Sequence, residues 1–194
     1  MNFNQIISIF KKIFNRLKRF PRYLLVKKYK LGNFHISTEH DKKYVTVIKE
    51  YLNRRTNRNS VIEIGVGLGD ILLGLDFKNL VAADHKQQIL DALKFRMSFM
   101  KKNKKNIIFK KIKIETDSID GNYDVIILVN FIHNIPTEIL RLKLEQMYHN
   151  NLLPGGEIIF DSLISETPSR YRYTHQPKVL NRNLNGTIKS LGKF

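Results

Sequence analysis

A strand, a glycine turn and a helix start follow one another directly in Val61-Ile62-Glu63-Ile64-Gly65-Val66-Gly67-Leu68-Gly69-Asp70. Glycines let the backbone turn sharply and let a ligand lie against it without a Cβ in the way. The helix start that follows presents N–H donors and a partial positive charge. This segment therefore predicts that a nucleotide-like ligand binds at the end of a buried strand of an α/β domain.

Strands and helices alternate from residue 60 onward. The pattern predicts strands at 60–64, 80–83, 106–112, 123–129 and 157–161, and helices at 70–75, 86–102 and 137–151. The apolar runs in the first and fourth strands are typical of parallel strands covered on both faces. Leu153-Pro154-Gly155-Gly156 predicts a turn before the fifth strand. Such a series specifies an open, doubly wound, mostly parallel sheet with helices on both faces.

The N-terminal segment has a different pattern. Apolar residues recur at helical spacing over residues 3–20, and most Lys and Arg side chains fall off that stripe. We expect a basic amphipathic helix that Pro21 ends. Residues 1–34 would form this helix and a linker, and residues 35–194 the α/β domain.

Two further helices are expected at the borders of the domain. A Ser37-Thr38 cap predicts a helix that continues to about residue 55. At the other end, residues 176–183 are expected to form the last helix and residues 186–194 a sixth strand.

The glycine turn differs from the common dinucleotide and phosphate motifs. A nicotinamide or flavin fingerprint requires a small residue where this chain has Asp70. Glu63 would repel a diphosphate, but it complements a ligand that carries an ammonium and a sulfonium. The turn has no Lys-Ser/Thr pair, which excludes a P-loop. The chain has no cysteine, which excludes disulfides and thiolate sites.

The spacing of Glu63, Gly65, Gly67 and Gly69 resembles motif I of class I S-adenosylmethionine-dependent methyltransferases. Asp84 at the end of the second strand, the segment 122–135 and the Pro-Gly-Gly lead into the fifth strand agree with this family in order and spacing. The resemblance covers roughly residues 60–162. It implies a Rossmann-like fold, S-adenosyl-L-methionine as the cofactor and methyl transfer as the activity.

The resemblance also implies roles for individual residues. It places Glu63, Gly65, Gly67 and Gly69 along the methionine half of the cofactor, Asp84 at the ribose and Asn130 near the sulfonium. The adenine-side acid would be Glu115 or Asp117, and we take Asp117. No spacing typical of a metal site is present.

His133 follows the fourth strand, where a methyl acceptor would enter. It is the candidate general base, and the alternative is a histidine that caps the next helix or packs over the cofactor. The Asn-Phe-Ile-His sequence at 130–133 lacks the Asp/Asn-Pro-Pro-aromatic signature of methylases that act on planar amino groups. We therefore expect an oxygen or amine acceptor on a small molecule or glycan. Residues 170–175 would either hold it or form a solvated loop.

Two other functions compete with this interpretation. One is an RNA or protein methyltransferase that uses the basic surface. The other is a non-catalytic, methyltransferase-like scaffold subunit. The family's sheet usually contains a seventh strand between the fifth and the sixth, and no residues remain for it here. The final strand is thus expected to be missing, through truncation or because a partner pairs with the open edge.

The net charge of +17 has two interpretations. A general bias toward Lys, Asn and Ile is favoured over a nucleic-acid footprint. The N-terminal helix would pack on the domain or another subunit, lie on an anionic membrane through residues 1–20, or contact RNA. The chain has no apolar run long enough to cross a bilayer and no secretory signal, so a cytoplasmic location is expected.

Overall fold

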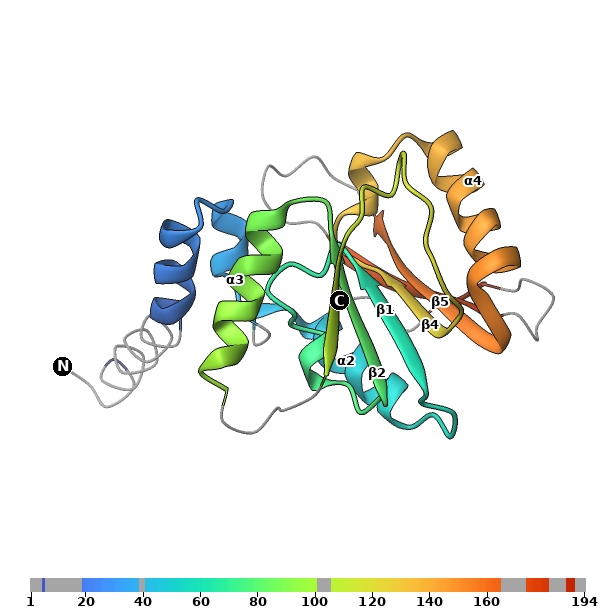
Figure 1. Cartoon of the computed structure of the whole chain (residues 1–194), viewed down its shortest axis with the longest axis horizontal. Helices are drawn as coiled ribbons and strands as arrows, with labels where there is room; N and C mark the ends of the chain where they lie inside the picture. The colour runs from blue at the N-terminus through green and yellow to red at the C-terminus, as the bar shows by residue number, and fades with distance from the viewer. Residues whose placement is uncertain are drawn as a thin grey trace.

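A seven-stranded sheet lies at the centre of the computed structural model, which describes residues 5, 19–38, 41–100, 106–164, 174–181 and 188–190 (Figure 1). The strand order is β3-β2-β1-β4-β5-β6-β7. The strands are β1 (Ser60–Ile64), β2 (Asn79–Asp84), β3 (Ile107–Lys111), β4 (Tyr123–Leu128), β5 (Leu152–Ile164), β6 (Thr174–Asn181) and β7 (Ile188–Ser190). Strands β1 to β5 are parallel, whereas β6 is antiparallel to β5 and β7 to β6. The predicted doubly wound, mostly parallel sheet is confirmed.

Helices cover both faces of this sheet (Figure 1). The α-helices are α2 (Lys43–Asn53), α3 (Gln87–Ser98) and α4 (Thr137–Gln146), which continues as a π-helix, η5 (Met147–Asn151). Neighbouring strand residues alternate between two cores, as strand geometry requires. Val61 packs with α2 and α3, and Ile62 packs in the core that contacts α4.

Two expected helices differ from the structure. The region expected as helix 70–75 contains only a 3-10 turn, η3 (Leu72–Gly74), and the Leu72 amide bonds to the Glu63 carboxylate 2.9 Å away. The helix expected from a Ser37-Thr38 cap begins only at Lys43. Thr38 donates its amide and hydroxyl to the Asp41 carboxylate, forming a separate turn before α2.

The expectation that Pro21 ends the N-terminal helix was wrong. Residues 19–28 are helical, so the helix runs through the proline. Proline costs one backbone hydrogen bond and a steric contact with the preceding turn. Burial of Leu25 and Val26 against the domain stabilises the helix beyond this point. Most of the stripe at 3–20 lies outside the described residues.

The C-terminal expectations also need correction. Residues 176–183 were expected to be helical, but β6 pairs antiparallel with β5 from Glu157↔Asn181 to Ile164↔Thr174. The edge of β5 is therefore not open. The place beside β5 that was expected to be empty is occupied by β6. An unpaired strand edge carries unsatisfied backbone groups, and β6 satisfies them within the chain. Most of the expected sixth strand at 186–194 and of segment 170–175 lies outside the described residues.

Candidate functional site

A cavity of about 410 Å³ lies at the carboxyl ends of β1, β2 and β4. It is lined by the glycine loop, the end of β2, the segment after β4 and residues that precede β1. The strand order reverses between β1 and β4, and ligands of open α/β sheets bind at such a reversal. The volume of the cavity lies within the range of small-molecule sites.

The three loop glycines have left-handed backbones, with φ of 71° at Gly65, 54° at Gly67 and 75° at Gly69. Gly65 and Gly67 line the cavity, and a Cβ on Gly65 would lie 2.4 Å from the Phe131 ring. Gly69 does not line it. A Cβ there would lie 2.8 Å from the Leu93 side chain, so Gly69 lets the loop pack closely on α3.

Glu63 is buried at the end of β1 and lines the cavity. Its Oε2 accepts the Leu72 amide at 2.9 Å and so fixes the turn that closes the glycine loop. Burial raises the pKa of Glu63 to about 8. A cation placed in this cavity would favour the ionised carboxylate and would itself be stabilised by it.

Asp84 ends β2 and is also buried at the cavity. Its carboxylate accepts the Lys86 amide at 3.0 Å and the Gly67 amide at 3.4 Å. Burial raises the pKa of this carboxyl group, and the two amide hydrogen bonds oppose the rise. The side chain therefore links the second strand to the glycine loop.

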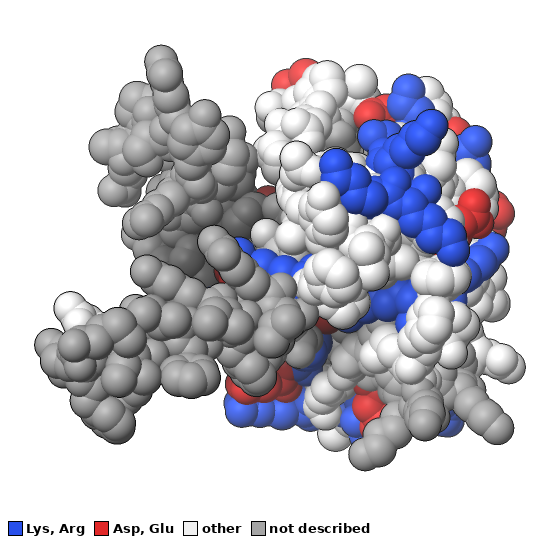
Figure 2. Space-filling view, turned by 90° about the vertical axis from the view of Figure 1, so that its left-hand side faces the viewer, with Lys and Arg blue, Asp and Glu red and all other residues white. Residues whose placement is uncertain are grey.

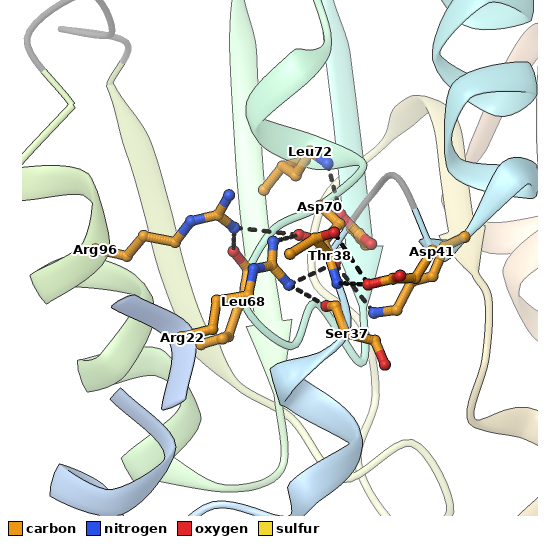
Figure 3. Close-up of polar contacts among 10 residues, drawn as sticks. Arg22, Ser37, Thr38, Asp41, Leu68, Asp70, Leu72 and Arg96 are labelled. Atoms are coloured by element: carbon orange, nitrogen blue, oxygen red, sulfur yellow. Dashed lines mark hydrogen bonds and ion pairs between the residues drawn. The ribbon is translucent and has the colours of Figure 1, made fainter. Parts of the chain in front are cut away.

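Asp70, directly after the loop, is bound by three cations from three segments, and Figure 3 shows two of them, Arg22 and Arg96. Arg22 from helix 19–28 contacts both carboxylate oxygens, Lys42 Nζ lies 3.0 Å from Oδ2, and Arg96 of α3 lies 3.2 Å from Oδ1. Burial alone would raise the pKa of Asp70, but the Arg22 hydrogen bonds and the neighbouring cations hold it well below its usual range. The residue that departs from the dinucleotide fingerprint thus anchors the N-terminal helix to the loop.

The N-terminal segment also forms a wall of the cavity. His35 is buried, its ring centroid lies 4.0 Å from that of Phe34, and its Cε1 lies 3.4 Å from where a Gly67 Cβ would be. Burial and the nearby Lys42 lower the pKa of His35 to about 4, so its ring is neutral at physiological pH. Sequence reasoning missed this wall, whose cavity-lining members include Arg22, Phe34, His35, Lys42 and Tyr44.

The remaining predicted site residues fall into two groups. Asn130 lines the cavity with φ of 70°, and its amide donates to the buried Asp161 carboxylate at 2.9 Å. Glu115 also lines the cavity. Asp117, the residue we preferred, is exposed and does not line it. Its carboxylate instead accepts the Lys113 amide and the Thr116 hydroxyl, both at 2.8 Å.

His133 lies on the 3-10 turn η4 (Ile132–Asn134) after β4. Its side chain is exposed and is not among the residues that line the cavity, whereas Phe131 and Asn134 are. Its role as a base stays a prediction. Across the described segments, no group of three His, Asp or Glu side chains is placed to hold a metal ion.

Comparison with solved structures identifies the fold. The N-methyltransferase NodS from Bradyrhizobium japonicum WM9, in complex with S-adenosyl-L-homocysteine, superposes with a TM-score of 0.57 at 18% identity, over 71% of this chain and 69% of NodS. The glycopeptide N-methyltransferase MtfA, complexed with S-adenosyl-L-methionine, gives 0.53 at 15% identity over 77% of this chain and 65% of MtfA. This chain has the class I methyltransferase fold.

A third structure with this methyltransferase fold is TehB from Haemophilus influenzae, with a TM-score of 0.54 at 17% identity. The superposition spans 68% of this chain and 44% of TehB. No protein-family model matches the sequence, and no curated protein matches it.

Proposed function

We propose that the chain transfers the methyl group of S-adenosyl-L-methionine to an oxygen or amine of a small molecule or glycan. One observation carries the proposal: two left-handed glycines and a buried strand-end carboxylate, Asp84, line a single cavity in a methyltransferase fold. NodS and MtfA are both N-methyltransferases, which supports an amine among the acceptors.

The cavity residues fit the parts of this cofactor. Gly65 and Gly67 leave room beside the backbone for the methionine half, and Glu63 supplies a carboxylate for its ammonium and sulfonium charges. Asp84 has the chemistry to accept ribose hydroxyls, as strand-end acids do in related nucleotide folds. Glu115 takes the adenine-side role in place of Asp117, because Glu115 lines the cavity.

The bound cofactor supplies an electrophilic methyl group on a sulfonium. The protein's task is then to orient an acceptor lone pair in line with that methyl. Phe131 and Asn134 line the cavity beside Asn130, the side from which we expect the acceptor to approach. His133, on the same turn, is the candidate base for acceptors that lose a proton in the transition state.

Calorimetry with S-adenosyl-L-homocysteine and S-adenosyl-L-methionine tests the cofactor assignment. We expect saturable binding to the full chain, weakened about tenfold or more by Asp84→Asn. The matched control is Asp120→Asn, which changes an exposed carboxylate outside the cavity lining. Absence of binding to the unmodified chain, or equal affinity in the Asp84 variant, would overturn the assignment.

A screen for uptake of labelled methyl by metabolites, sugar nucleotides, RNA and proteins tests the acceptor class. Transfer to a metabolite or sugar supports the proposal. Transfer to RNA or protein alone would show that the acceptor is a macromolecule and not a small molecule or glycan. Cofactor binding with no transfer to any acceptor in the screen points to the scaffold alternative.

A further inference from the structure

Helix 19–28 has an apolar row on the face that points away from the domain. Phe20, Tyr23 and Leu24 are 56%, 43% and 51% exposed, at the spacing that places side chains on one side of a helix. The opposite face holds the buried residues Leu25 and Val26. The domain buries only one apolar face of this helix. The other apolar face is left exposed to solvent.

Cations surround this outward row. The exposed cations are Lys27, Lys28, Lys30 and Arg19, of which Arg19 is paired with Asp41. Residues 1–38 contain nine Lys and Arg and not a single Asp or Glu, so this segment of the sequence contributes much of the net charge of +17. Figure 2 shows this side of the molecule, with a band of Lys and Arg beside uncharged side chains.

We propose that this outward face, formed by Phe20, Tyr23, Leu24 and Lys27, binds the surface of an anionic lipid bilayer. Phe20 and Leu24 would enter the boundary between headgroups and acyl chains, and Lys27 and its neighbours would remain at the phosphates. Among the described helices, none has the length and apolarity to cross a bilayer.

The helix need not detach to make this contact. Leu25 packs with Leu68 and Ala92, and Arg22 binds Asp70, so the inward face is already fixed. Lys28 Nζ lies 3.5 Å from the Phe95 ring centroid, and that ring contacts Phe99, which is 69% exposed. Phe99 therefore adds an exposed aromatic side chain next to the helix.

Charge and polarity favour lipid over other partners. A second copy would bring two strongly cationic segments together, which costs energy. Nucleic acid would satisfy the cations through its phosphates but would give Phe20 and Leu24 no apolar partner. An anionic bilayer matches the cations and the apolar row at the same time. This inference does not depend on the proposed methyl transfer.

Co-sedimentation of the full chain with vesicles tests it. One set of vesicles is phosphatidylcholine alone, and the other is phosphatidylcholine mixed with phosphatidylglycerol. We expect binding to the mixed vesicles only, with partitioning reduced about tenfold or more by Phe20→Ser with Leu24→Ser. Lys27→Glu should also weaken binding to the mixed vesicles. Leu142→Ser is the matched control, because Leu142 is 50% exposed on α4, away from this helix, and should bind like the unmodified chain.

Several results would overturn the proposal. These are no binding to mixed vesicles, equal binding to both kinds, or equal partitioning of the double variant and the unmodified chain. RNA binding without vesicle binding would replace lipid with nucleic acid. Conversion of a dimer to a monomer by the double variant, without vesicle binding, would assign the face to a second copy. Matching circular dichroism spectra of all variants would exclude unfolding as the cause.

Discussion

Arg22 contacts both carboxylate oxygens of Asp70, with Nη1 donating to Oδ2 at 3.0 Å and Nη2 donating to Oδ1. The two residues are 48 positions apart, on helix 19–28 and directly after the glycine loop. Both side chains are about nine-tenths buried. Their pairing makes the N-terminal helix part of the structure that supports the cavity.

Asp70→Asn should therefore destabilise the fold by about 3 kcal/mol, because it leaves Arg22, Lys42 and Arg96 crowded around a neutral amide. The native carboxyl has a lowered pKa, so its contribution is present above the unfolded pKa of about 4 and is lost as pH falls below it. Urea unfolding of both proteins at pH 7 and pH 3 measures this. The difference between them should shrink at the lower pH.

Arg22→Ala serves as the comparison. It should cost less than Asp70→Asn, because Lys42 and Arg96 still bind the carboxylate. An Asp70→Asn protein as stable as the unmodified chain at pH 7 would show that the Asp70 carboxylate and its cations contribute no net free energy of folding.

Gly65→Ala should abolish most cofactor binding. A Cβ at φ of 71° is strained, and it would lie 2.4 Å from the Phe131 ring inside the cavity. We expect affinity for S-adenosyl-L-homocysteine to fall about tenfold or more, measured by calorimetry. Gly121→Ala is the control, since Gly121 has φ of 94° but lies outside the cavity lining. That variant should lose about 1 kcal/mol of stability and keep its affinity.

Glu63→Gln should stabilise the protein increasingly as pH rises. The pKa of Glu63 is raised to about 8, so the folded state holds a proton that the unfolded state releases above about 4.5. Stability of the unmodified chain then falls with pH between these values, by up to about 1.4 kcal/mol per pH unit from this group. Thermal unfolding of both proteins at pH 5 and pH 8 measures the difference. A constant difference would show that Glu63 does not titrate in this window.

Separate neutralising substitutions of Glu115 and Asp117, the two acidic residues after β3, distinguish their roles. Glu115→Gln should weaken cofactor binding, because Glu115 lines the cavity, whereas Asp117→Asn should leave affinity unchanged. Asp117→Asn should instead lower stability slightly, since its carboxylate accepts the Lys113 amide. The reverse pattern in calorimetry would return the adenine-side role to Asp117.

The parallel half of the fold was predictable because its signals are local. The apolar runs of β1 and β4 and the glycines of the loop each specify a conformation within a few residues. The first strand was predicted with its observed bounds, Ser60–Ile64. Glu63, Gly65, Gly67, Asp84 and Asn130 were also expected at the site, and the structure brings all five to one cavity.

The errors concern contacts between distant segments. Nothing near Pro21 indicates that burial of Leu25 and Val26 will maintain the helix beyond it. The pairing of β6 with β5 depends on a strand edge far away in sequence. The same holds for His35, which lies against Gly67 in a segment that Arg22 and Lys42 connect to Asp70. A more local contact, the turn after β3, sets which carboxylate lines the cavity, and it places Glu115 there and Asp117 outside.

The Arg22–Asp70 pair also has a thermodynamic consequence. A partner that pulls helix 19–28 away from the domain must break this pair and remove one wall of the cavity. A partner that instead binds the helix in place favours the state with the wall intact. Occupancy of the cavity and attachment of the helix are then linked equilibria, and each changes the affinity of the other by the same factor.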